Sequence, residues 1–221
     1  MKINWFGHSC FQITSQSDKN SKILIVIDPF DKEIGLKLPK LKADILLITH
    51  EHSDHNNAKA VSGNLEEKPL IIRGPGEYES KGVFIQGIPS FHDEVGGKER
   101  GENTIYRIEA EEISVCHLGD LGQKELTTEQ IDLMNGVDVL MIPVGGNYTI
   151  SAKEALKVMS QIEPKITIPM HYSLPKLKIK LAGLKEFQKM LGVGSIEPIN
   201  SLSIKKKDLS EDEAKVIILK P

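Results

Sequence analysis

Residues 49–55 read Thr-His-Glu-His-Ser-Asp-His, which places three imidazoles and the carboxylate of Asp54 within six residues. The segment follows directly on the apolar run Ile45 to Ile48. Imidazole nitrogen and carboxylate oxygen are the usual protein ligands for zinc and related divalent ions. Histidines crowded together without a metal would repel one another as they protonate. The motif therefore predicts a metal site and makes the chain a metallohydrolase candidate.

The segment that leads into this motif, residues 44–49, is predicted to be a buried parallel strand because it is short, apolar and partly β-branched. The ligands then begin at the carboxyl end of a strand, where open α/β sheets bind their ligands. Asp54 is predicted to start a helix that covers residues 55–61. Two pairs of ligands separated in this way can address two neighbouring metals: His50 with His52, and Asp54 with His55.

The pattern His-x-His-x-Asp-His over residues 50–55 resembles the signature of the metallo-β-lactamase-fold hydrolase superfamily. Residues that fit the superfamily's remaining ligands follow in order, each at the end of a strand-like stretch: His92, Asp120 and His171. The resemblance covers most of the chain and includes four further segments: Gly7 to Phe11, Asp28 to Phe30, Pro143 to Gly146, and Ile166 to His171. Within the superfamily, the chain resembles the small single-domain branch that includes the ascorbate-6-phosphate lactonase-like proteins.

The resemblance implies a cofactor of two divalent metal ions. One ion would be held by His50, His52 and His92, and the other by Asp54, His55 and His171. Asp120 would bridge them, with a water or hydroxide completing both shells, so that Asp54 and Asp120 are the expected catalytic carboxylates. Zinc is the favoured ion, although manganese and iron suit the same mixed ligands. His117 lies inside the strand before Asp120 and is predicted to be either a core histidine or one that supports a metal ligand without touching the metal.

Five residues near the expected metal edge are candidates for substrate contacts: His8, Arg100, Asn103, Gly146 and Tyr172. His8 could equally be a hydrogen-bonded turn histidine, and Tyr172 could simply pack. Gly146 lies in a glycine-containing loop that either offers backbone donors to an anion or only lets the chain turn. The charged, glycine-rich segment 93–103 is predicted to be either a mobile lid or an ordinary solvated loop.

Composition is consistent with a compact cytoplasmic enzyme. A chain of 221 residues with 39% hydrophobic content can bury one large core, which favours a single metallo-β-lactamase-like domain over residues 1–221. The net charge of −3 gives no general attraction to nucleic acid, and two cysteines suggest no disulfide framework. No stretch approaches the roughly 20 apolar residues of a membrane span, so no membrane partner is expected. The oligomeric state is left open.

Strand-like runs recur along the chain, and helical patterns alternate with them in its second half. Strands are predicted at 2–6, 10–14, 23–28, 44–49, 70–73, 83–91, 104–109, 113–118, 138–142, 165–170, 202–206 and 215–219. Helices are predicted after caps at Thr127 and Ser151, and over 184–191. This pattern implies an α/β chain with two sheets covered by helices. The superfamily resemblance implies a four-layer αββα sandwich with the metals at one edge between the sheets.

The leading functional hypothesis is a dinuclear metal hydrolase in which a metal-bridging hydroxide attacks a small ester, a lactone or a phosphorylated metabolite. One alternative is a phosphodiesterase or nuclease, supported by lysines at 176, 178, 180, 185, 189 and 205–207. Another is a non-heme iron redox protein on the same fold. A secreted β-lactamase is disfavoured, because it would normally need an export signal.

Overall fold

Two mixed β-sheets form the centre of the computed structural model, which describes residues 1–16, 21–64, 67–209 and 214–221. The six-stranded sheet has the order β14 (Leu202–Ser203), β1 (Lys2–Trp5), β2 (Phe11–Gln16), β3 (Lys22–Ile27), β5 (Ile45–Ile48) and β7 (Leu70–Arg73). The seven-stranded sheet has the order β15 (Lys215–Val216), β13 (Ile166–Met170), β12 (Val139–Pro143), β11 (Ile113–His117), β10 (Glu102–Ala110), β9 (Val83–Phe91) and β8 (Gly76–Ser80).

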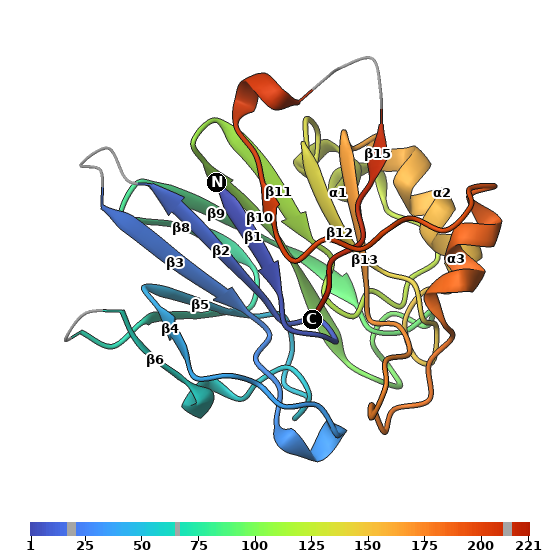
Figure 1. The fold of residues 1–221 in the computed structure, drawn as a ribbon, viewed down its shortest axis with the longest axis horizontal. Coiled ribbons are helices and arrows are strands. Elements are labelled where there is room, and N and C mark those ends of the chain that lie inside the picture. Colours follow the sequence, from blue (N-terminus) through green and yellow to red (C-terminus); the bar gives the residue numbers. More distant parts are fainter. Residues whose placement is uncertain (17–20, 65–66, 210–213) are drawn as a thin grey trace.

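Helices cover the outer face of the seven-stranded sheet. They are α1 (Thr128–Leu133), α2 (Ala152–Ile162) and α3 (Leu184–Met190), and Figure 1 shows α2 and α3 on the far side of β12 and β13 from the blue strands. Capping boxes start α1 at Thr127 and α2 at Ser151, as predicted. Helix α2 ends at Ile162, and its C-cap Glu163 lies directly before Pro164.

The outer face of the six-stranded sheet has a different cover. It consists of the short ribbon of β4 (Leu41–Ala43) and β6 (Val61–Gly63) together with two 3₁₀ turns, η1 (Lys32–Ile34) and η2 (Ala58–Ala60). A third turn, η3 (Lys206–Asp208), follows β14. A small apolar cluster that includes Phe30, Ile34, Leu46 and Val61 joins this cover to the sheet. The α/β sandwich class is confirmed, with 3₁₀ turns and a ribbon in place of α-helices on this side.

Burial follows the position of each strand. Strand β2 alternates buried and half-buried residues, whereas β5, β11, β12 and β13 are buried along their whole length. The main hydrophobic core contains residues from the inner faces of both sheets, such as Ile13 and Ile25 from one and Ile85 and Ile108 from the other. No helix in the described parts of the chain is long and apolar enough to cross a bilayer. The organisation of residues 1–221 as one domain stays a prediction.

Strand direction brings the predicted ligands to one edge. In the six-stranded sheet, β1, β3, β5 and β7 run the same way. In the seven-stranded sheet, β9, β11, β12 and β13 share one direction, since β10 is antiparallel to both β9 and β11. The carboxyl ends of strands that run the same way lie at one edge of their sheet. The loops that follow β5, β9, β11 and β13 carry the candidate ligands.

Some local predictions are wrong. The helix expected over residues 55–61 is absent: the described chain there makes turns, the 3₁₀ turn η2 and the strand β6. The side chain of Asp54 does not cap a helix, because its carboxylate faces His8 and His55. Strands β4, β6 and β8 were not predicted, and β14 and β15 are shorter than the predicted runs at 202–206 and 215–219.

Candidate metal centre

Seven predicted ligands converge at the shared edge of the two sheets. The loop after β5 supplies His50, His52, Asp54 and His55, and the loops after β9, β11 and β13 supply His92, Asp120 and His171. All except His52 and Asp54 are buried. The turn between β1 and β2 adds His8, which is fully buried and lies against the rings of His171 and His55, at centroid distances of 4.3 Å and 4.9 Å.

Asp120 lies at the centre of this arrangement. Its Oδ2 atom is 3.2 Å from His55 Nε2, 3.2 Å from His171 Nε2 and 3.4 Å from His92 Nε2. Two atoms that each bind one ion at about 2.1 Å with a tetrahedral angle lie about 3.4 Å apart. The spacings around Asp120 are therefore those of atoms that share a metal ion.

The imidazoles fall into groups of metal-binding size. The ligand atoms of His50, His52 and His92 lie within 4.8 Å of one another, which is the first predicted set. The ligand atoms of His55 and His171 also lie within this distance, together with those of His8. Asp54 Oδ2 is 3.6 Å from His55 Nε2 and 3.1 Å from His8 Nε2. His8 was predicted as a substrate contact, and the structure places it among the metal-facing histidines.

Buried nitrogen atoms without hydrogen-bond partners support a metal at this edge. Among the residues that the structure describes, the buried Nε2 atoms of His50 and His55 have no hydrogen-bond partner, and His55 Nε2 faces only the Asp120 carboxylate at 3.2 Å. On the opposite side of each ring, His50 Nδ1 is 3.0 Å from Thr49 Oγ1, and His55 Nδ1 is 2.9 Å from Asp28 Oδ2. A ring that donates from Nδ1 leaves the Nε2 lone pair free for a metal. The donor set therefore fits a divalent ion.

Asp28 holds the loop after β5 in place from the side away from the candidate metals. It is fully buried, and its carboxylate accepts hydrogen bonds from the Thr49 amide at 2.8 Å, the Thr49 hydroxyl at 2.6 Å and His55 Nδ1. Because the Thr49 hydroxyl donates to Asp28, its oxygen accepts from His50 Nδ1. Burial raises the pKa of Asp28, but His55 outweighs this effect and lowers it. One ionised carboxylate thus sets the tautomers of two candidate ligands.

The charges around the centre favour a cation, and His55 has to release a proton to bind one. Burial raises the pKa of Asp120, yet His171 and His55 hold it well below its ordinary value. Burial and the neighbouring His55 lower the pKa of His50 to about 3, so this ring is neutral. For His55 burial lowers the pKa, but Asp120 and Asp28 raise it well above 6.5. Ionised carboxylates facing a neutral His50 form a site that attracts a cation.

Asn103 was predicted as a substrate contact, and the structure corrects this. Asn103 is 1% exposed, and its Nδ2 donates to Ser90 Oγ and to the Leu118 carbonyl. Its Oδ1 accepts from the Asp120 amide at 3.0 Å. A Cβ on Gly119, which has φ +57°, would lie 2.3 Å from the same Oδ1. The side chain of Asn103 is therefore committed to holding the backbone of Asp120 and has no donor left for a substrate.

Gly146 and Tyr172 are also not placed as substrate contacts. The Gly146 amide donates to the Ile150 carbonyl within its own loop, so this donor is occupied. Tyr172 is buried and packs on Trp5, with ring centroids 5.2 Å apart. His117 is fully buried with its Nε2 3.0 Å from the Ser9 carbonyl, as expected for a core histidine.

A cavity of about 310 Å³ opens onto the centre. Its lining combines the candidate ligands His52, Asp54, His92, Asp120 and His171 with Ser53, Arg100, Asn147, Tyr148 and Ile179. Of the predicted substrate contacts, Arg100 is the one that lines this cavity. Sequence reasoning missed Ile179, and in the loop that carries Asn147 and Tyr148 it singled out only Gly146. These residues reach the centre because loops far apart in sequence fold together. The role of Asp28 in holding Thr49 and His55 was also not predicted. Its position directly after an apolar strand could have indicated that it belongs to the site.

The fold and the donor set define a metallo-β-lactamase-type metal centre. A family model described as a beta-lactamase superfamily domain matches residues 2–171. Beyond this superfamily, the chain belongs to the UPF0173 metal-dependent hydrolase family, and it is an enzyme of that class. It is 30% identical to a UPF0173 metal-dependent hydrolase of Thermococcus onnurineus, with 100% of this chain and 97% of that protein covered.

Solved structures agree with this assignment. A Thermotoga maritima protein, described as a candidate zinc-dependent hydrolase of the metallo-β-lactamase superfamily, is 36% identical and has a TM-score of 0.76. The match covers 99% of this chain and 98% of that one. A metallo hydrolase of Ignicoccus hospitalis, at 23% identity and a TM-score of 0.65, shares the fold over 92% of this chain and 99% of its own.

Proposed function

We propose that the protein is a dinuclear hydrolase that uses two divalent ions, with zinc favoured, to cleave a small ester, a lactone or a phosphorylated metabolite. The observation that carries the proposal is the position of Asp120. Its Oδ2 lies 3.4 Å from a nitrogen of one histidine group, in His92, and 3.2 Å from nitrogens of the other, in His55 and His171. A carboxylate between two donor groups is suited to bridging two ions.

The residues divide the chemical work. When bound, a pair of divalent ions makes water acidic near neutral pH and stabilises the negative charge that develops on an electrophile. His50, His52 and His92 would hold one ion, and Asp54, His55 and His171 would hold the other, with Asp120 between them. His8, at 3.1 Å from Asp54 Oδ2, orients that carboxylate. Asn103 and Asp28 fix the backbone of Asp120 and the ring of His55.

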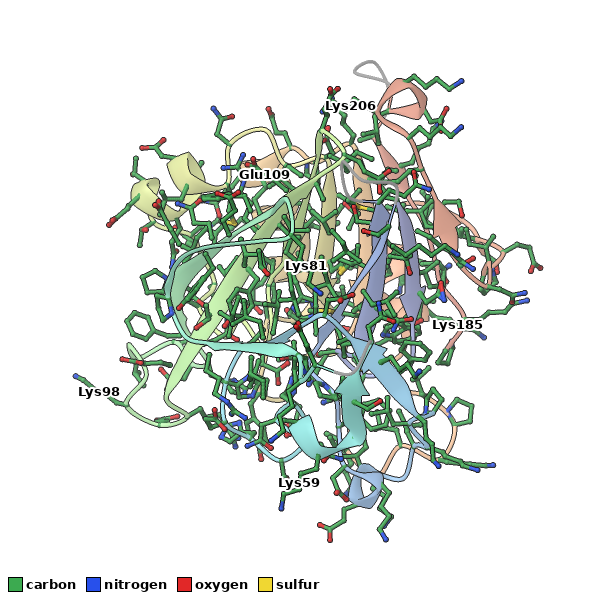
Figure 2. All side chains as sticks on the ribbon, turned by 90° about the vertical axis from the view of Figure 1, so that its left-hand side faces the viewer. Lys59, Lys81, Lys98, Glu109, Lys185 and Lys206 are labelled. Carbon is green, nitrogen blue, oxygen red and sulfur yellow. The ribbon has the colours of Figure 1, made fainter. Side chains whose placement is uncertain are left out.

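The size of the cavity supports a small-molecule substrate. A volume of about 310 Å³ is at the lower end of small-ligand sites, which span roughly 300–1,000 Å³. The lysines that suggested a nuclease are spread over the molecule: Lys178 and Lys180 flank Ile179 of the cavity lining, whereas Lys206 lies far from it. Lys206 pairs with Asp138 at the start of β12, the edge opposite the candidate metal centre. Figure 2 shows Lys206 at the other end of the molecule from Lys98, which belongs to the loop that carries Arg100. We therefore favour a metabolite over nucleic acid.

Metal content tests the dinuclear proposal. We expect close to two divalent ions per chain in protein purified without chelator. Chelation should abolish ester and lactone hydrolysis, because among the described residues that line the cavity Ser53 is the one serine and there is no cysteine to act as a nucleophile. Elemental analysis measures the ions, and a panel of lactones, esters and phosphodiesters measures activity. A content of one ion or none contradicts the proposal, and native iron with no hydrolysis would favour the redox alternative.

Two histidine variants test how the residues share the ions. His92→Ala should mainly empty the site that includes His50 and His52, whereas His171→Ala should mainly empty the site that includes His55. Each variant should retain about one ion per chain, because each removes a ligand from one group only. Elemental analysis after titration with a competing chelator measures the outcome. Equal loss of both ions from both variants would contradict this allocation of ligands.

A further inference from the structure

The metal centre lies where two cavities meet. The cavity of about 310 Å³ opens onto Asp120, and a second cavity of about 550 Å³ lies against His50 on the side of β5. His52 and Arg100 line both cavities. Arg100 therefore borders both cavities beside the candidate metal centre.

The backbone of Arg100 is held in place by a buried carboxylate. The loop from 93 to 100 wraps around Asp93, whose two oxygens accept four amide hydrogen bonds of 2.8–2.9 Å. One of these donors is the amide of Arg100 itself. These hydrogen bonds fix the conformation of the loop and hold the backbone of Arg100 beside the candidate metal centre.

The side chain of Arg100 is ordered but keeps its charge uncompensated. Its Cζ lies 3.0 Å from the ring centroid of Tyr148, which also lines the metal cavity. Within the described ranges of the chain, no carboxylate pairs with Arg100. Arg73, the other arginine of the larger cavity, is paired with Glu51. Stacking on an aromatic ring leaves the N–H groups at the edge of a guanidinium free. Those groups can form bidentate hydrogen bonds to a carboxylate or phosphate.

We infer that Arg100 is an anion-binding residue, and that the substrate carries a carboxylate or phosphate group close to the bond that is cleaved. The inference rests on the proposed hydrolase function. The cavity is small, so a group bound to Arg100 and a group at the metals belong to one compact molecule. With Asp54 and Asp120 ionised, two divalent ions and a hydroxide leave a formal charge of about +1 at the centre, which also favours an anionic substrate.

Discrimination between matched substrates tests the inference. The probes are two aryl esters that differ only at the end of the acyl chain, where one has a free carboxylate and the other its methyl ester. We expect the metal-loaded protein to prefer the carboxylate. Arg100→Ala should lower the ratio of the two kcat/KM values about 10- to 100-fold, which is the effect of losing a charge-assisted hydrogen bond of about 1.5–3 kcal/mol. Arg100→Lys should give an intermediate ratio.

Lys98→Ala is the matched control. Lys98 is exposed on the same loop, and Figure 2 shows it projecting outward at the tip. This variant should leave the ratio and the metal content unchanged, and Arg100→Ala should retain its metals. Equal losses for both esters in Arg100→Ala, or no preference in the unaltered protein, would overturn the inference while leaving the hydrolase proposal intact.

A binding experiment separates the two proposals and the two kinds of anion. Titration of metal-loaded protein with inorganic phosphate or with acetate, followed by calorimetry, does not depend on hydrolysis. We expect Arg100→Ala to weaken binding of the preferred anion about 10-fold or more relative to the unaltered protein and to Lys98→Ala. Unchanged affinity for both anions overturns the inference. Weakened binding without hydrolysis of any ester would retain the anion site and refute the proposed function.

Discussion

Asp120→Asn is expected to lose metal and hydrolytic turnover together. The substitution keeps the shape of the side chain, but it removes the charge that lies among the nitrogens of His55, His92 and His171. An amide oxygen is a weaker ligand than a carboxylate, so neither ion is held as firmly. We expect turnover to fall on the order of 10²–10⁴-fold, the effect of removing a positioned catalytic group. Elemental analysis and rate measurements on the same sample test this.

Asp138→Asn is a matched control for this variant. Asp138 is also buried, but it accepts from the Ser114 amide and pairs with Lys165 and Lys206 at the opposite edge of the sheet. Its substitution should lower the free energy of unfolding and leave metal content unchanged. If Asp120→Asn keeps both ions and near-normal hydrolysis, Asp120 is only a turn residue and the proposed site is wrong.

Asp28→Asn should lower metal affinity about 10- to 100-fold, the usual cost of losing a carboxylate that orients a metal-binding histidine. An amide in place of the carboxylate can direct its NH₂ group at His55 Nδ1, which then accepts instead of donating. The proton moves to Nε2, the atom that faces Asp120, and the ring can no longer bind a metal there. Turning the amide over would instead point its NH₂ group at the Thr49 backbone N–H, which is itself a donor.

Competition with a coloured chelator measures this loss of affinity, and denaturant unfolding of the metal-free protein measures the structural contribution. Asp44→Asn serves as the control, because Asp44 accepts from the Leu24 amide and pairs with Lys81 away from the metals. It should change stability without changing affinity. Asp28→Asn with unaltered metal affinity would show that the tautomer of His55 is set by something other than Asp28.

Local patterns in the sequence predicted much of the site. Each candidate ligand follows an apolar run that predicts a strand. Strands that run in one direction end at one edge of a sheet, so the positions of His92, Asp120 and His171 after such strands predicted that they converge. The capping boxes of α1 and α2 are likewise local. Strand β8 was missed because it is largely exposed and polar, which gives no apolar alternation to detect.

Tertiary contacts account for the errors at the site. Asp54 has the residue type of a helix cap, but its carboxylate is drawn to His8, a residue 46 positions earlier. Asn103 was assigned to the substrate because it is polar and close to His92 in sequence. Its true partners, Ser90, Leu118 and Asp120, become visible only when β9, β10 and β11 are side by side. No spacing rule relates these positions.

The centre draws its donors from both sheets, and this has a consequence for the whole molecule. The loop after β5 belongs to the six-stranded sheet, whereas the loops after β9, β11 and β13 belong to the seven-stranded sheet. A metal bound between these loops would cross-link the two sheets at this edge without a covalent bond. Since unfolding would separate these donors, the thermal midpoint of the protein depends on the free metal concentration as well as on its apolar core.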